Sequence, residues 1–189
     1  MFVIHHSEPS KVVGIDPGAS GALAFIDFDA WTLEVHDMPH FWEEVKGKKR
    51  KRVNVEELAS LIFKHNLRLM STEKVHAMPQ MDVKSVFSFG RFYGQIEMIA
   101  AAAKIDRLET DPAVWKRTMQ VDSDKDYSRT RCGLLVPAAK TILTRKTDHD
   151  RAEAILLAFY GLLKLGIPPQ ELELLPRGVA APKTSNKKR

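Results

Sequence analysis

The sequence predicts an α/β domain built on a mixed β-sheet that is flanked by helices. Two observations lead to this prediction. Three short apolar segments separated by turns come first, as is typical of an antiparallel meander. Segments of strand and helix character then alternate along the rest of the chain, as is typical of parallel strands joined by helices. We therefore expect antiparallel strands at one edge of the sheet and parallel strands in its middle.

The meander is predicted from apolar runs that end at turn residues. The three expected strands are Lys11 to Ile15, Ala22 to Asp27 and Thr32 to Asp37. Pro17 and Gly18 lie in the first turn, and both residue types favour turns. Residues 39–53 are polar and strongly basic, and we expect them to form a connection.

The remaining elements follow from helical spacing, capping residues and short apolar runs. Asn54 is the expected N-cap of a helix in which Glu56 and Glu57 occupy the first turn. The other expected elements are a strand from Leu67 to Val75, a long apolar helix from Ser85 to Lys104, a strand from Arg107 to Thr110, a short helix from Pro112 to Trp115, helical segments at 124–135 and 136–143, and a helix from Asp148 to Leu165.

The length of 189 residues suits one domain with a well-buried core. We expect a loose leader at residues 1–10, the folded domain at 11–175 and a basic disordered tail at 176–189. The longest uncharged apolar stretch, Ala154 to Leu163, is far shorter than the ~20 residues needed to cross a bilayer, so we expect no membrane partner. Cys132 is the one cysteine, as expected in a reducing compartment such as the cytoplasm or an organelle interior.

The positive charge is concentrated in two places. The formal net charge is +5, and the stretch 176–189 alone carries five cations and no acid. The rest of the chain is therefore neutral, apart from local clusters. The sharpest cluster is at residues 46–52, where six of seven residues are basic, including Lys48, Lys49, Arg50, Lys51 and Arg52. We expect this segment to bind a polyanion such as DNA, although a solvated loop has the same composition.

Four acids are candidates for one catalytic site. Asp16 follows the first strand, and Glu73 lies near the end of a later strand that we expect beside it. Parallel neighbours would bring both carboxylates to the same end of the sheet, where catalytic groups of open α/β sheets collect. Asp150 and Glu153 are three residues apart at the start of the last helix, so they share one face of that helix. Each acid also has a structural explanation, as a turn former, a surface ion-pair partner or a helix-start acid.

Such a cluster predicts a site for divalent cations. Like charges ~4 Å apart repel by ~1–4 kcal/mol at protein-surface dielectrics, so clustered carboxylates need a counter-ion. A set of hard oxygen ligands, without cysteines or a histidine pair at ligand spacing, suits Mg²⁺ or Mn²⁺. Two such ions can activate water and stabilise the leaving oxygen of a phosphodiester.

Three motifs in this order resemble the RuvC-type Holliday junction resolvases. They are Gly14-Ile15-Asp16-Pro17-Gly18, Glu73-Lys74-Val75, and the run from Asp148 to Ala154, which reads Asp-His-Asp-Arg-Ala-Glu-Ala. The last motif is closest to the phage and organelle branches of that family. The resemblance covers about residues 11–163. It implies an RNase H-like fold, a homodimer, two divalent metals per active site and symmetric nicking of four-way DNA junctions by a DNA-associated protein.

The resemblance also implies roles for individual residues. Asp16, Glu73 and Glu153 would bind the metals, with Asp150 or Asp148 as the fourth carboxylate, and His149 would orient the water or a phosphate. The expected DNA contacts are the basic segment 48–52 together with Lys74, His76, Arg91, Lys116 and Lys125. The chain departs from the family at Lys74, where many members have Gln, and at His76, where bacterial members have an aromatic residue. The aromatic helix that contains Phe87 corresponds to the dimer interface of the family.

Three other functions fit parts of the pattern. A less selective nuclease for branched or flap DNA would use the same carboxylates. The segment from Gly14 to Gly21 also resembles the first phosphate loop of the sugar kinase and actin-type ATPases, which need a second, similar domain. A non-catalytic junction-binding protein would use the acids only to stabilise helix starts and turns.

Overall fold

The structure is a computed structural model, and it describes residues 8–45, 47–74, 81–121 and 125–175. The tail expected at 176–189 and residue His76 lie outside these ranges, as does most of the expected leader. No helix within the described ranges is long and apolar enough to cross a bilayer.

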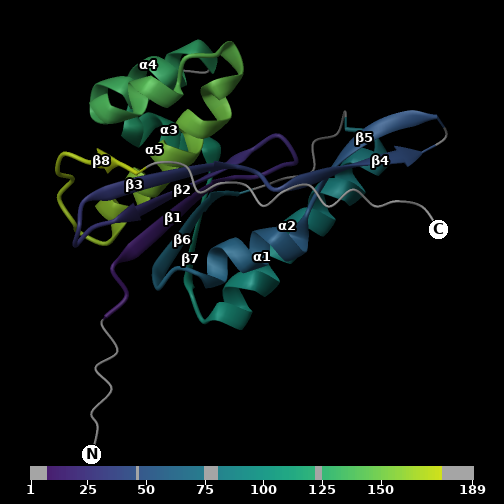
Figure 1. Cartoon of the computed structure of the whole chain (residues 1–189), viewed down its shortest axis with the longest axis horizontal. Coiled ribbons are helices and arrows are strands. Elements are labelled where there is room, and N and C mark those ends of the chain that lie inside the picture. Colours follow the sequence, from purple (N-terminus) through teal and green to yellow (C-terminus); the bar gives the residue numbers. More distant parts are fainter. Residues whose placement is uncertain (1–7, 46, 75–80, 122–124, 176–189) are drawn as a thin grey trace, which may run out of the picture.

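A six-stranded sheet organises the fold (Figure 1). Its strand order is β7-β6-β1-β2-β3-β8. The strands are β1 (Lys11–Asp16), β2 (Ala22–Asp27), β3 (Thr32–Asp37), β6 (Leu67–Glu73), β7 (Asp106–Thr110) and β8 (Glu173–Leu174). The β1–β2 and β2–β3 pairs are antiparallel, which confirms the predicted meander. The β1–β6, β6–β7 and β3–β8 pairs are parallel.

The mixed sheet was predicted correctly, but the placement of its two halves was wrong. The antiparallel pairs lie in the middle of the sheet, and the parallel pairs lie at both edges. The reason is that β6 and β7 add to the free side of β1, while β8 closes the free side of β3. The short β8 was not predicted, because a two-residue strand has too few side chains for a visible pattern.

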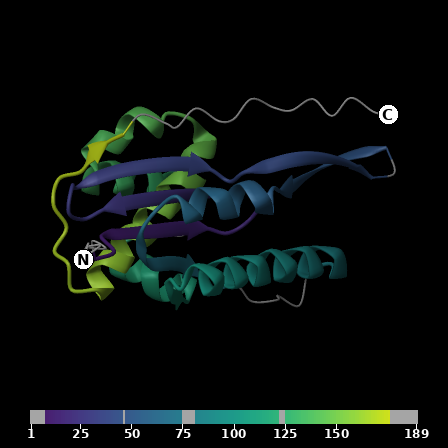
Figure 2. The same ribbon diagram turned by 60° about the horizontal axis from the view of Figure 1, so that its bottom comes forward.

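Helices cover both faces of the sheet (Figures 1 and 2). On one face, α1 (Val55–Phe63) and α2 (Val83–Ala103) pack against a core that includes Val13 and Ile15. On the other face, α3 (Pro112–Met119), α4 (Lys125–Leu135) and α5 (His149–Lys164) pack against a core that includes Val12 and Ala24. Two 3₁₀ helices, η1 (Pro137–Ile142) and η2 (Lys146–Asp148), connect α4 to α5.

The expected connection at 39–53 is a two-stranded antiparallel ribbon, which corrects the sequence prediction. Strand β4 (His40–Val45) pairs with β5 (Lys48–Val53), and the ribbon projects beyond the sheet (Figures 1 and 2). Cross-strand pairing places Glu43 opposite Arg50 and Glu44 opposite Lys49, so part of the repulsion within β5 is offset. The basic composition of residues 46–52 gave no sign that two of these residues pair with the acids of β4.

Three strands terminate at the same end of the sheet, called the site edge below. Strands β1, β3 and β6 run in the same direction, because β2 is antiparallel to both β1 and β3, and β6 is parallel to β1. Asp16, Asp37 and Glu73 are the last residues of these strands. The site edge, where these strands terminate, therefore carries two of the predicted site acids and the base of the β4–β5 ribbon.

Candidate active site

Asp16 and Glu73 occupy neighbouring strand ends. Ile15 is in register with Thr72 in the parallel β1–β6 pair, so the two acids follow at equivalent positions. The hydroxyl of Thr72 donates a hydrogen bond to the backbone carbonyl of Ile15 at 3.3 Å, which ties the two strands together next to the acids. This juxtaposition is the one expected from the sequence.

Helix α5 brings two more acids to this edge because it packs very closely on β1. A Cβ atom on Gly14 would overlap the backbone of Ala154 and Ala158, so only glycine allows this approach. The close packing sets Glu153, which precedes Ala154, against the end of β1. Asp150 lies one turn earlier on the same helix.

The pKa of Asp16 reflects both its burial and the three acids near it. Burial raises the pKa of Asp16 well above its ordinary value, and the negative charges of Glu153, Asp150 and Glu73 raise it further. Lys116 acts in the opposite direction. No hydrogen bond or ion pair to the Asp16 carboxylate occurs among the described residues. We refer to Asp16, Glu73, Asp150 and Glu153 below as the four acids.

Helix α3 supplies neutral and positive partners for the acids. The indole Nε1 of Trp115 donates a hydrogen bond to Glu73 Oε1 at 3.1 Å, and the Trp115 side chain is fully buried. Burial raises the pKa of Glu73 despite this hydrogen bond and the charge of Lys116. Asp111, the N-cap of α3, contributes in the same direction as burial.

Glu153 has two partners of different kinds. The Lys116 ammonium lies 3.5 Å from Glu153 Oε1, and the Ser128 hydroxyl donates to the same oxygen at 3.1 Å. Ser128 is buried in α4. Nothing in the sequence pointed to Ser128, because its partner is 25 residues away. His149 Nε2 lies 2.9 Å from Asp150 Oδ1, which puts this histidine beside the four acids.

Asp148 is held by two arginines, which favours Asp150 as the fourth acid of the cluster. Its carboxylate accepts hydrogen bonds from the backbone and the guanidinium of Arg145, and it lies 3.1 Å from Arg151 Nη1. Burial opposes its charge, but these partners outweigh burial and hold the pKa of Asp148 below its ordinary value. Asp148 is satisfied by arginines, whereas the three acids with the largest effect on Asp16 are Glu153, Asp150 and Glu73, so the acid cluster is defined without Asp148.

Arg151 connects the start of α5 to the sheet. Its guanidinium forms two short hydrogen bonds to the Asp37 carboxylate, at 2.6 and 2.7 Å, and a third to the carbonyl of Ile142. Asp37 ends β3 and Arg151 follows Asp150, so this pair fixes the helix that carries two of the acids. Sequence reasoning missed the pair, because its members are 114 residues apart.

The donor set of the four acids fits a hard divalent cation, but their side chains do not form a ready-made metal site. Among the described residues, no three His, Cys, Asp or Glu side chains are close enough together to hold a metal ion. Four carboxylates without a counter-ion repel one another, which favours rotamers that point apart. These side chains would have to move closer together to hold a cation, and the raised pKa of Asp16 shows that burial and the neighbouring acids disfavour its charged form.

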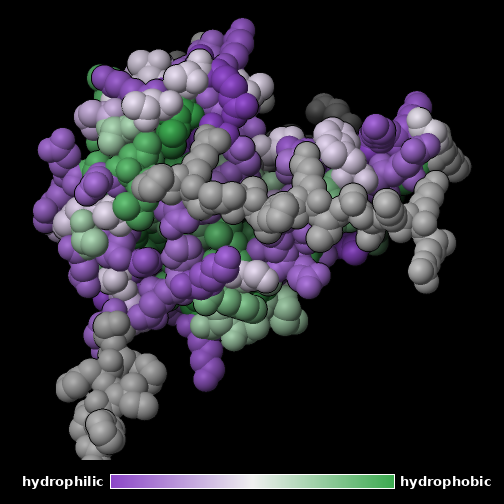
Figure 3. All heavy atoms as spheres, viewed as in Figure 1, coloured by the Kyte–Doolittle hydropathy of each residue, from purple (hydrophilic) through white to green (hydrophobic). Residues whose placement is uncertain are grey.

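The residues expected to contact DNA lie in different parts of the molecule. Lys116 lies among the four acids, whereas the segment 48–52 forms β5 of the projecting ribbon. Hydrophilic side chains cover the outer part of this ribbon in the space-filling view (Figure 3). Lys74 is exposed just after β6, Arg91 is exposed on α2, and Lys125 begins α4.

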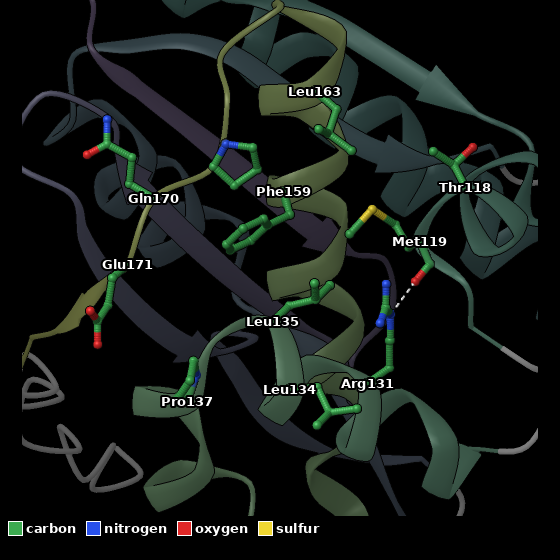
Figure 4. Close-up of a pocket in the computed structure, with 11 residues that line it drawn as sticks. Thr118, Met119, Arg131, Leu134, Leu135, Pro137, Phe159, Leu163, Gln170 and Glu171 are labelled. Carbon is green, nitrogen blue, oxygen red and sulfur yellow. Dashed lines mark hydrogen bonds between the residues drawn. The ribbon is translucent and has the colours of Figure 1, made fainter.

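A separate pocket lies between α3, α4 and α5 (Figure 4). Apolar side chains such as Met119, Leu134, Phe159 and Leu163 line it, and Arg131 donates a hydrogen bond to the carbonyl of Met119 at its edge. None of the four acids lines this pocket. The acids therefore form a separate site at the edge of the sheet.

Comparison with known proteins supports the fold. No model of a protein family and no curated protein sequence matches the chain. Among solved structures, T. thermophilus RuvC in complex with a Holliday junction substrate is similar, with a TM-score of 0.50 and 13% identity, covering 82% of this chain and 96% of that chain. A second Thermus thermophilus RuvC structure (TM-score 0.47, 15% identity, 82% and 96% covered) and the fowlpox virus Holliday junction resolvase (TM-score 0.46, 13% identity, 82% and 99% covered) are also similar. The chain has the mixed α/β sheet and flanking helices of the RNase H-like fold seen in RuvC.

Proposed function

We propose that this chain is a metal-dependent endonuclease that resolves four-way DNA junctions. The observation that carries the proposal is the convergence of the four acids, from two strand ends and one helix start, on a single edge of the sheet. The likeness of fold to a structure described as RuvC with a Holliday junction substrate favours this substrate over other branched DNA. The order of the three sequence motifs favours it as well.

The four acids would hold two Mg²⁺ or Mn²⁺ ions. When bound, such a pair of ions supplies a nucleophilic water and stabilises the leaving oxygen of a phosphodiester. Asp16 is central in this arrangement, because the charges of the three other acids all act on it. Trp115 and Ser128 hold Glu73 and Glu153 from the side of the protein core, which leaves their second oxygens for the ions.

Lys116 would also contact the DNA in this mechanism. In the structure its ammonium compensates Glu153 and lies 5.3 Å from the centre of the Trp115 ring. With divalent cations bound beside Glu153, the Lys116 ammonium would contact the phosphate that is cut. His149 contacts Asp150 at 2.9 Å and the carbonyl of Lys146 at 3.0 Å, and in this mechanism it would orient a water or a phosphate.

We further propose a homodimer. A four-way junction has approximate two-fold symmetry, and two matched cuts need two equal sites at a fixed separation. Helix α2 exposes several large apolar side chains, namely Val83 (84% exposed), Phe87 (71%) and Met98 (68%). Burial of these side chains against a second copy would remove them from water. Sedimentation of the wild type and of Phe87→Asp tests this, with a dimer and a monomer as the expected results.

A cleavage assay on synthetic DNA tests the proposed function. We expect symmetric nicks in a four-way junction when Mg²⁺ or Mn²⁺ is present, and slower cutting of a three-way junction and a flap of the same sequence. Asp16→Asn should abolish cutting and retain junction binding, because removal of an acid lowers the repulsion of phosphate. Equal rates on all three substrates would favour the less selective branched-DNA nuclease. Loss of binding together with cutting would contradict the role given to Asp16.

A further inference from the structure

We infer that the β4–β5 ribbon is a DNA-contacting arm on which Trp42 stacks against a base exposed at the branch point. This inference rests on the proposed function and deepens it, because it names a contact outside the four acids. The ribbon has little core of its own, and an isolated two-stranded hairpin is marginally stable in water. Two large aromatic side chains are nevertheless exposed on it, Trp42 at 62% and Phe41 at 50%.

The two faces of the ribbon differ in what they contact. Phe41, Glu43 and Arg52 share one face, where Arg52 Nε donates to Glu43 Oε2 at 2.9 Å. Arg52 also reaches Ser88 of α2 at 3.3 Å, so this face is turned towards the helix. Trp42 lies on the opposite face, since side chains alternate along a strand. The Trp42 face is therefore turned away from α2.

The Trp42 face combines an aromatic ring with cations. Trp42 is directly opposite Lys51. Lys49 lies on the same face two residues along β5, opposite Glu44, which offsets part of its charge. The lysines are about 7 Å apart along the strand, close to the separation of consecutive phosphates on an extended DNA strand. The His40 and Trp42 rings form a T-shaped pair, with centroids 6.4 Å apart and planes at 84°, and Trp42 remains 62% exposed. A base stacked on the indole would thus have Lys51 directly beside it for one flanking phosphate, with Lys49 next along the strand.

The position of the ribbon relative to the acids suits this contact. Strand β4 follows Asp37 after two residues, and Asp37 lies in register with Asp16 through Ala22 of β2. The base of the ribbon is therefore two strand spacings, or about 10 Å, from Asp16. Trp42 is five residues beyond Asp37, which is about 17 Å along an extended chain. DNA held at the four acids would extend past the ribbon within the width of one duplex.

Charge favours nucleic acid as the occupant of this face. Five consecutive cations on β5 stand against two acids on β4, so the described part of the ribbon is strongly positive. An aromatic side chain on such a surface gains stacking energy with any base, because every base has a π-face. A protein partner would need an acidic surface with a pocket for the Trp42 indole. No feature of the described ribbon selects a pocket of one particular shape.

Fluorescence with full-length protein tests the inference. The probe is a four-way junction with 2-aminopurine at the branch point, titrated in EDTA so that no cutting occurs. We expect Trp42→Ala to weaken binding about 5- to 100-fold, the range for loss of one base–aromatic stack. Trp42→Phe should retain affinity within about threefold, because phenylalanine also stacks on bases. The 2-aminopurine emission should fall on binding of wild type and stay unchanged with Trp42→Ala.

Phe41→Ala is the matched control on the other face, and it should bind as wild type. Equal losses for Trp42→Ala and Phe41→Ala, unchanged affinity of Trp42→Ala, or unchanged 2-aminopurine emission with wild type would each overturn the inference. Junction cutting, measured separately with Mg²⁺, tests the proposed function. A wild type that cuts junctions while Trp42→Ala behaves identically refutes only the ribbon contact. A wild type that needs Trp42 to bind the junction, yet does not cut it in Mg²⁺, refutes only the nuclease function.

Discussion

Substitution of Gly14 by alanine tests whether close packing of α5 on β1 builds the site. The new Cβ would overlap the Ala154 carbonyl oxygen and the Ala158 amide nitrogen, and it would lie 2.9 Å from Ala158 Cα. Ordinary van der Waals contacts of a Cβ begin at 3.4 Å. Helix α5 must therefore move away from β1 by at least about 0.5 Å to relieve even the longest of these three contacts. All three are backbone atoms, which cannot rotate away. The retreat carries Glu153 away from Asp16 while every acid stays in place in the sequence.

The expected cost is at the upper end of overpacking effects, about 3 kcal/mol. For a protein of this size, such a loss lowers Tm by roughly 6–12 °C. Thermal unfolding followed by circular dichroism measures it. Junction cutting, assayed well below the lowered Tm so that the variant is folded, should fall at least about tenfold, because a misplacement of about 1 Å at a site costs this much or more.

Gly133→Ala in α4 is the control, since the nearest atoms to a Cβ there belong to the side chain of Lys140, at 3.2 Å or more, and that flexible side chain can move aside. It should leave the stability within about 1 kcal/mol of wild type, because alanine favours a helix more than glycine does. If Gly14→Ala unfolds at the same temperature as wild type, the packing of α5 on β1 described above is wrong. If it is destabilised but cuts junctions at the full rate, activity does not depend on the alignment of Glu153 with Asp16.

The remaining predictions concern charge. Because folding raises the pKa of Asp16, its ionised form destabilises the metal-free protein at pH 7, and this penalty disappears as the pH falls through the folded pKa towards 3.8. Asp16→Asn should therefore be more stable than wild type at pH 7 in EDTA, by about 1 kcal/mol or more, with the difference vanishing near pH 4 in urea titrations. Arg151→Met should lose about 2–4 kcal/mol in urea, because it leaves the buried Asp148 with one arginine, whereas exposed Arg117→Met should change little. Neutralising 48–52 should weaken binding to all DNA and flatten its salt dependence, and an unchanged salt slope would show that the ribbon is not on the DNA.

The sequence predicted the elements with a local signal. The meander was visible because apolar residues such as Val12 and Val13 run through each strand up to a turn. The N-cap of α1 was predicted because Asn54 directly precedes a helical pattern. The structure confirms it, since the backbone N–H of Glu57 donates a hydrogen bond to the Asn54 side chain. The meeting of Asp16 and Glu73 followed from parallel neighbouring strands.

Features that depend on distant partners were not predictable in the same way. The ribbon looked like a connection, because its charges hid the pairing of β4 with β5. The difference between Asp148 and Asp150 depends on Arg145 and Arg151, whose geometry no spacing rule gives. The buried donor Ser128 reaches Glu153 from another helix, so only the folded arrangement reveals it.

Anomalous diffraction from crystals grown with Mn²⁺ tests most directly whether the four acids form a metal site. We expect two anomalous peaks among Asp16, Glu73, Asp150 and Glu153, with Asp16 bound to manganese and Asp148 still held by its arginines. Crystals of Asp16→Asn should lose at least one of the two peaks. Wild-type crystals that show no peak between these side chains, at Mn²⁺ concentrations that support DNA cutting, would contradict the central claim.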